Sequence, residues 1–406
     1  MSTPAVEVSY RALLAVPSLG RVVLGTQVAR IAQQMASLGL VLFVLARYGS
    51  PELAGLVAFC GLFPGLVVSP VAGALLDRHG RVRLVVLDLS VALVALGVVA
   101  GLSVLHLLPP WLLLLIASVA SLTGPLSNTG LRSLFPLLVP RHLWERGNAV
   151  DANGQLLAGM IGLPLAGAAV QVLGPELSLL GIAGVFGVAA VILRRAPDPP
   201  TVVASTGQLG LDAWQGLAYW WRNPTLRGLG FTYMAIGSVG GMLAIALPVL
   251  VLQRFQQGPA IVGSLFAVGG AAGAAAGLMA GRIPTEGRER ALLAIPALVI
   301  GLSVVVLAIA PGLAVAAVAM AISGSMTSVM NVVLITLRQR RTDPAWLGRA
   351  FAISGSINTL GGPIRSAVAG PLVSRSLDGA LVFGATLGAL ACVLAWVTIP
   401  AHDTSS

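Results

Sequence analysis

The sequence predicts an all-α membrane protein with twelve transmembrane helices in two bundles of six. Hydrophobic residues make up 57% of its 406 residues and charged residues only 9%, and the mean hydropathy is +0.93. A soluble domain carries about 25% charged residues, so the lipid bilayer is the expected solvent. A helical span needs about 20 apolar residues, and this length therefore holds roughly twelve spans with short connections.

Polar loops divide the apolar segments into the expected spans. The spans run over residues 19–46, 52–76, 84–107, 111–136, 148–173 and 176–194, and then over 226–252, 259–281, 291–310, 312–337, 348–373 and 379–399. We expect an N-terminal six-helix bundle over 1–194, a cytoplasmic linker over 195–225 and a C-terminal bundle over 226–406. Residues 209–221 of the linker alternate Leu, Trp and Tyr with polar residues. This pattern is typical of an amphipathic helix on the membrane surface, or of an extension of the next span.

The arginines predict the orientation of these spans. All 24 basic residues are Arg; nineteen lie in loops on the side that holds both termini and three in loops on the other side. Because positive charge is retained in the cytoplasm, we expect both termini there and a multi-pass protein of the cytoplasmic membrane. The net charge of +10 follows from these short loops, so no nucleic-acid partner is expected.

An internal repeat supports two bundles. Pro51 and Gly55 recur 208 residues later as Pro259 and Gly263, and Arg132 has a counterpart in Arg338. Transporters commonly arise by duplication of such a half, with the binding site between the two copies.

A polar loop separates the second and third spans. It runs Gly73-Ala-Leu-Leu-Asp77-Arg78-His-Gly80-Arg81-Val-Arg83. Gly80 permits a tight turn, and an acid at a helix C-terminus needs compensating positive charge. We interpret the loop as a conformational latch, to which Arg132 and Asp151 also contribute.

These residues resemble the loop signature of the major facilitator superfamily, G-x-x-x-D-R-x-G-R-x-R. The resemblance implies the major facilitator fold and a transporter that works by alternating access. It implies neither enzymatic activity nor a cofactor.

The first span carries Gln27, Arg30 and Gln34 on one helical face. A charge deep in a span costs roughly 2.5 to 3.5 kcal/mol, so Arg30 should face a water-filled cavity or an acidic partner. A cavity role and an ion pair inside the bundle are both open.

In the resembling family, spans 1, 4, 7 and 10 line the central cavity. The resemblance thus makes further polar residues candidates for solute contact, with hydrogen bonding between helices as the alternative. The additional candidates are Ser121, Asn128, Tyr233, Ser238, Met242, Thr327, Asn331 and, in span 11, Arg365.

The fifth span resembles the glycine-proline motif of drug-exporting members, although Leu163 and Ala168 replace two of its glycines. Glycines let helices approach closely and proline bends them, so we expect a helix-packing role here and in span 11. The residues are Gly159, Gly162, Pro164, Gly167, Gly362 and Pro363.

Two acids, Asp88 and Asp151, lie inside spans. They are candidates for proton coupling, or they pair with Arg83, Arg132 or Arg146. The acid that several drug and proton antiporters carry in their first helix is absent. Together with Arg30 and Arg365, its absence favours a neutral or anionic amphiphile over a cation.

We therefore expect a secondary transporter for a small amphipathic solute, with proton-linked efflux as the first hypothesis. A lipid or lysolipid translocase and a non-transporting membrane sensor or scaffold are the alternatives. The lipid bilayer, the solute and protons are the expected partners, and the protein is expected to be a monomer. The four histidines are scattered, so no metal site is predicted.

Overall fold

The computed structural model describes residue 13 and residues 16–198, 217–280, 285–342 and 365–400. These residues are helical apart from short connections, and no strand occurs among them. This confirms the predicted all-α class. Contacts within the chain divide it into two compact units: unit 1 comprises residues 1–47 and 60–204, and unit 2 comprises 48–59 and 205–406.

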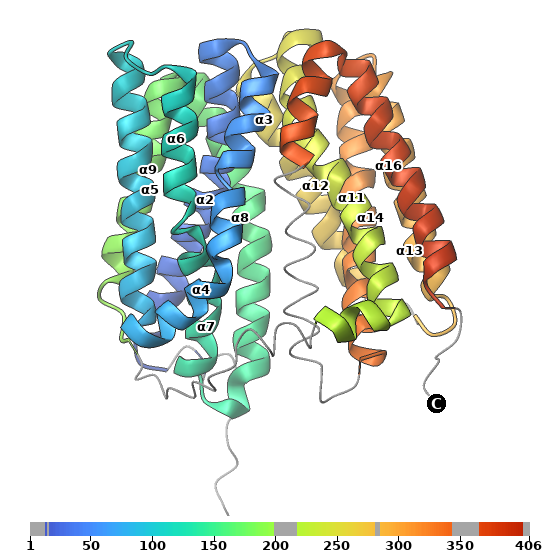
Figure 1. Cartoon of the computed structure of the whole chain (residues 1–406), viewed down its shortest axis with the longest axis horizontal. Coiled ribbons are helices and arrows are strands. Elements are labelled where there is room, and N and C mark those ends of the chain that lie inside the picture. Colours follow the sequence, from blue (N-terminus) through green and yellow to red (C-terminus); the bar gives the residue numbers. More distant parts are fainter. Residues whose placement is uncertain (1–12, 14–15, 199–216, 281–284, 343–364, 401–406) are drawn as a thin grey trace, which may run out of the picture. The chain divides into compact units, whose positions relative to one another are not determined.

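Unit 1 contains the spans of the N-terminal half (Figure 1). Its helices are α2 (Leu19–Tyr48), α4 (Phe63–His79), α5 (Arg81–Val104), α6 (Pro110–Ser121), α7 (Gly124–Leu138), α8 (Trp144–Leu173) and α9 (Pro175–Leu193), with a short 3-10 turn at Arg141–Leu143. The fourth predicted span is broken into α6 and α7 at Leu122 and Thr123. Pro125, which has no backbone N–H to donate, follows the break directly.

Unit 2 contains α11 (Pro224–Val249), a π-turn η2 (Leu250–Arg254), α12 (Pro259–Ala280), α13 (Glu289–Ala308), α14 (Leu313–Arg340) and α16 (Leu377–Thr398). Residues 217–222 and 365–375 are also helical. The predicted span over 348–373 lies mostly outside the described residues, as do Gly362, Pro363 and residues 209–216 of the expected amphipathic helix. Eleven described helices are long and apolar enough to cross a membrane.

The short helix α3 (Pro51–Cys60) groups with unit 2, although it begins the second predicted span. Gly55 lies against the backbone of Ser366 and Gly370, where any Cβ would overlap the chain. At the same end, the hydroxyl of Ser374 donates a hydrogen bond to the carboxylate of Glu52. The expected domain boundaries at 194 and 226 stay predictions.

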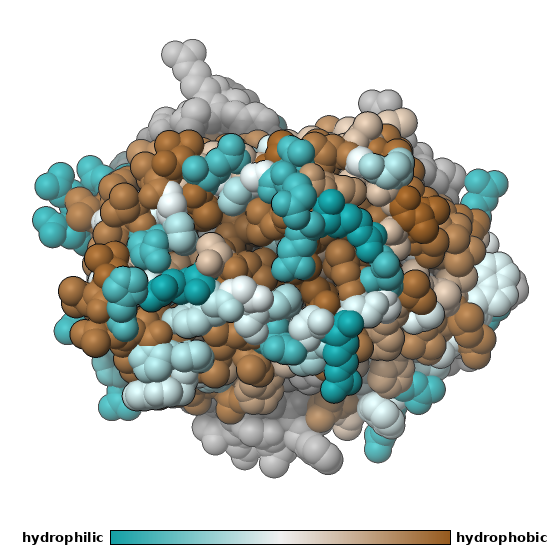
Figure 2. Space-filling model, turned by 90° about the horizontal axis from the view of Figure 1, so that it is seen from above, coloured by the Kyte–Doolittle hydropathy of each residue, from teal (hydrophilic) through white to brown (hydrophobic). Residues whose placement is uncertain are grey.

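Large apolar side chains cover the outside of the helices. Val172 and Leu278 are each 79% exposed, as expected where lipid rather than water surrounds a helix. Figure 2 shows hydrophilic side chains gathered on the end that faces the viewer, among apolar ones that extend to the sides. The chain is a multi-pass membrane protein.

Candidate solute-binding site

A cavity of about 230 Å³ lies inside unit 2, between α11, α13 and α14. Its walls are Tyr233, Ile236, Gly237, Val239, Gly240 and Leu243 of α11, Ile300 of α13, and Ser323, Thr327 and Asn331 of α14. The predicted cavity residues Tyr233, Thr327 and Asn331 thus come together here. Drug-sized ligands occupy about 300 to 1,000 Å³, so this space suits a small solute or part of a larger one.

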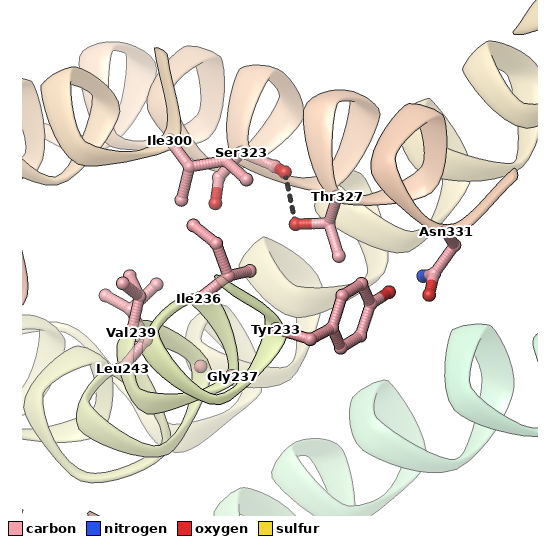
Figure 3. A pocket seen from close by; sticks show the side chains of 10 residues that line it. Tyr233, Ile236, Gly237, Val239, Leu243, Ile300, Ser323, Thr327 and Asn331 are labelled. Carbon is pink, nitrogen blue, oxygen red and sulfur yellow. Dashed lines mark hydrogen bonds between the residues drawn. The ribbon is translucent and has the colours of Figure 1, made fainter. Parts of the chain in front are cut away.

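The cavity is amphipathic. Val239, Leu243 and Ile236 form its apolar end, and the ring of Tyr233 points toward Thr327 and Asn331 at the polar end (Figure 3). The polar residues Ser323, Thr327 and Asn331 of α14 lie on one face of the helix because they are four residues apart.

The polar groups in the cavity differ in how they are satisfied. The Thr327 hydroxyl donates to the Ser323 carbonyl oxygen at 2.8 Å. By contrast, the Tyr233 hydroxyl is buried and has no hydrogen-bond partner among the described residues. A buried polar atom without a partner costs free energy, and such an atom at a cavity wall is suited to bind a ligand.

The predicted residues Ser238 and Met242 lie outside this cavity. The Ser238 hydroxyl donates to the Met234 carbonyl oxygen at 2.7 Å. Met242 is buried against Gly384 of α16. Their structural surroundings are those of helix packing.

Arg365 borders the cavity at Gly237. Its Nη1 donates to the Met234 carbonyl oxygen at 3.3 Å, and a Cβ on Gly237 would overlap this nitrogen. The Nε atom is buried and has no hydrogen-bond partner among the residues that the structure describes. The charge of this arginine therefore lies beside the cavity.

The polar face of α2 lies against α8 of the same unit. Arg30, 4% exposed, forms an ion pair with Asp151 at 2.6 Å from Nη2 to Oδ1, and its Nη1 donates to the Asp151 backbone oxygen at 3.0 Å. The Gln27 side chain lies on Gly154, and Gln34 lies on Gly162, where an added Cβ would be 2.7 Å from the Gln34 Cβ. Of the two roles left open for Arg30, the structure shows the ion pair.

This pair corrects the expected partners of Asp151. Pairing with Arg83, Arg132 or Arg146 was one of the two roles left open for this acid, but Asp151 faces α2 and binds Arg30. Arg83 and Arg132 are exposed. The close approach of α2 and α8 at Gly162 brings Arg30 and Asp151 together.

Asp88 on α5 has a different environment. It is 6% exposed and accepts a hydrogen bond from the Thr123 hydroxyl at 2.6 Å. No ion pair to Asp88 is found within the described ranges, which corrects the expected arginine partners. Thr123 lies at the break between α6 and α7, a break that the run Thr123-Gly-Pro could have signalled.

The other predicted cavity residues of unit 1 are Ser121 and Asn128. Ser121 is buried where α6 contacts α4, and its hydroxyl accepts from the Gly65 N–H at 3.3 Å. Asn128 on α7 is exposed.

The signature loop forms the turn that the sequence predicts. α4 ends at His79, and Gly80 has a φ of +91°, a conformation that favours glycine. The side chain of Asp77 and the surroundings of Gly73 lie outside the described residues, whereas Arg78 is exposed. The latch role of the loop therefore stays a prediction.

Asp198 is a site residue that the sequence reading missed. Its Oδ1 accepts from the Arg81 backbone N–H at 2.9 Å, so it caps the first turn of α5. Its side chain lies directly against Gly80, where any Cβ would overlap it. The partners are far apart in sequence, and no local pattern indicates the contact.

In the glycine-proline motif, Gly159 and Gly162 face the Gln34 side chain. Pro164 lies inside α8, and Gly167 is buried. Three or more His, Cys, Asp or Glu residues arranged to hold a metal do not occur in the part of the chain described.

Comparison with known proteins identifies the family. The family model for the Major Facilitator Superfamily matches residues 22–366. The uncharacterized MFS-type transporter y4rN of Sinorhizobium fredii is 35% identical over 400 residues, 98% of each chain. Macrolide efflux protein A of Streptococcus pyogenes is 24% identical over 84% of this chain and 85% of the relative.

A solved structure has the same fold. A variant of the nucleoside transporter NupG matches with a TM-score of 0.78 and 12% identity, over 94% of this chain and 99% of the other. The fold and the motif-based resemblance are both confirmed, and the chain belongs to the major facilitator superfamily of transporters.

Proposed function

We propose that this transporter exports a small amphipathic solute across the cytoplasmic membrane by alternating access, driven by the proton gradient. The observation that carries the proposal is the amphipathic cavity between α11, α13 and α14. The similarity to a macrolide efflux protein supports export over uptake. The arginine distribution supports both termini in the cytoplasm.

A larger side chain inside the cavity tests the proposal. In proteoliposomes with an imposed pH gradient and a panel of labelled amphiphiles, Thr327→Trp should lower the initial transport rate at least tenfold because it fills the cavity. Val318→Trp adds the same bulk to α14 at a side chain that is 57% exposed, and it should transport normally. Equal rates for the wild type and Thr327→Trp would rule out this cavity.

Asp88 is our candidate for proton exchange. A hydroxyl can donate to a carboxylate and accept from a protonated carboxyl, so Thr123 can satisfy both forms of Asp88. A guanidinium only donates, so the Arg30 contact suits only the charged form of Asp151.

Asp88→Asn should abolish solute transport driven by the pH gradient in proteoliposomes but retain solute exchange without a gradient. Asp378→Asn is the control, because Asp378 is exposed and pairs with Arg254 outside the cavity. If Asp88→Asn stays sensitive to the gradient, proton exchange takes place elsewhere or the transport is not proton-linked.

We also propose that the signature loop stabilises one state of the cycle. Asp77→Asn should then change the labelling rate of single cysteines placed at the helix ends. Unchanged labelling in both the presence and the absence of solute would contradict this role.

A further inference from the structure

Arg365 lies on two glycines of α11. A Cβ on Gly237 would overlap its Nη1, and one on Gly241 would lie 2.8 Å from the Arg365 Cβ. Only residues without a side chain leave room for the guanidinium in this position. Gly237 and Gly241 thus leave space against α11 for a positively charged side chain inside the membrane.

This charge has few partners among the residues that the structure describes. A guanidinium carries five N–H donors, and the described acceptor of Arg365 is one backbone oxygen, of Met234. Its Nε is buried without a partner among the described residues. A half-buried charge with unused donors inside the helices is costly, unless a ligand supplies the missing acceptors.

The acids of the described unit 2 helices α11 to α16 pair with other arginines: Glu289 with Arg340 and Arg341, and Asp378 with Arg254. The stretches 213–285, 290–342 and 344–377 contain neither Asp nor Glu. A second arginine, Arg338, is buried on α14 seven residues after Asn331. Arg338 is on one helix that lines the cavity and Arg365 lies against another, and this positive charge favours an anion.

We propose that Arg365, with the unpartnered Tyr233 hydroxyl, binds the anionic head group of the solute. The apolar body of the solute would lie along Ile236, Val239 and Leu243. Carboxylates, sulfonates and phosphates each present two oxygens on one atom, which a guanidinium can bind with two parallel hydrogen bonds. This inference rests on the proposed export function, and it defines the charge of the exported solute.

Gly237 makes the head-group contact possible. It lines the cavity, and a Cβ on it would overlap the guanidinium, so the charge of Arg365 lies next to the cavity at this residue. A methyl group at position 237 would displace the guanidinium while leaving every charge of the protein in place.

Three probes that share one phenylbutyl group but differ in charge separate the effect of charge on binding from the effect of shape. They are 4-phenylbutane-1-sulfonate, 4-phenylbutan-1-ol and (4-phenylbutyl)trimethylammonium, whose charges do not change with pH. Calorimetric titration of the purified protein in neutral detergent should show at least tenfold tighter binding of the sulfonate than of the alcohol. Equal binding of the three probes, or no binding of the sulfonate, would overturn the inference.

Variants locate the contact. Arg365→Gln and Gly237→Ala should each weaken sulfonate binding at least tenfold and leave alcohol binding within threefold, whereas Arg365→Lys should retain much of the preference. Arg375→Gln is the matched control, because it removes an exposed arginine from the same helical segment. If Arg365→Gln does not fold, Gly237→Ala still decides. Sulfonate binding unchanged in both variants would contradict the proposal.

Transport distinguishes this inference from the proposed function. Gradient-driven transport of the alcohol or the ammonium, but not of the sulfonate, would leave export standing and reject the anionic head group. No transport of any labelled amphiphile would reject export itself. The lipid as a source of the anion is tested by replacing a neutral phosphatidylcholine membrane with one rich in phosphatidylglycerol. Loss of sulfonate binding only in the second membrane assigns the same site to a lipid phosphate.

Discussion

Two arginines that lie among the helices, Arg30 of unit 1 and Arg365 of unit 2, have opposite surroundings. Arg30 binds both the carboxylate and the backbone oxygen of Asp151. Arg365 donates to one backbone oxygen, and its Nε has no partner among the described residues. The same residue type thus forms a structural ion pair at Arg30, whereas at Arg365 we propose contact with a ligand.

The difference follows from where the acids lie. The spans of unit 1 contain Asp88 and Asp151, whereas the long stretches 213–285 and 290–342 of unit 2 contain no acid. A buried arginine with an acid in reach stabilises packing, and removal of either partner leaves an uncompensated charge. One without an acid must bind something else. The following predictions test this contrast.

The largest expected effect is that of Arg30→Ala. It leaves Asp151 without its cation, and breaking a buried pair costs about 3 kcal/mol or more. The midpoint of thermal denaturation in detergent should fall by several degrees, and the double variant Arg30→Met/Asp151→Leu should recover most of this loss. An unchanged midpoint, combined with lost solute binding, would return Arg30 to a cavity role.

Gly162→Ala should have a smaller effect. The new Cβ would lie 2.7 Å from the Gln34 Cβ and 2.9 Å from the Ile31 backbone oxygen, and such overpacking costs about 1 to 3 kcal/mol. Gly181→Ala on α9 is the control, since nothing lies within 4 Å of its added Cβ. Equal thermal midpoints for both variants would show that α2 and α8 are loosely packed at Gly162.

Asp198→Ala tests an exposed polar contact of the same unit. Losing the cap of α5 should cost about 1 kcal/mol or less. Asp198→Asn keeps an oxygen acceptor for the Arg81 N–H and should be nearly neutral. Hydrogen exchange of the amides at the start of α5 measures the effect, and equal exchange in all three proteins would mean that the cap contributes nothing.

Arg365→Gln should change stability least. It removes a half-buried charge that has no acidic partner among the described residues, and the amide can still donate to the Met234 oxygen. We expect a change in the free energy of unfolding within about 1 kcal/mol, in contrast to Arg30→Ala. A loss as large as that of Arg30→Ala would mean that Arg365 is also a structural residue.

The fold could be predicted from the sequence because its signals are local. A span is a run of apolar residues, and the signature loop lies within eleven consecutive residues. The break at Gly61 was missed because apolar residues continue on both sides, and the break at Thr123 was missed although the following Gly and Pro could have signalled it. The ion pair of Arg30 was left open because Asp151 is 121 residues away.

The candidate site was predicted only where polar residues recur at helical spacing. Thr327 and Asn331 stand out in an apolar span, and so does Tyr233. The apolar wall formed by Ile236, Val239 and Leu243 could not be recognised, because the same residue types also face lipid. The contact of Arg365 with Gly237 and Gly241 was missed because glycines carry no chemical signal of their own.

Gly237 has a consequence for how substrate preference can change in evolution. A single-nucleotide change in a glycine codon is sufficient to produce alanine, and this would move a charge that sits on another helix. Transporters in which a glycine leaves room for an arginine beside the cavity can then change the solutes they accept without losing or gaining a charged residue. A mutational survey restricted to polar positions would not find the cause.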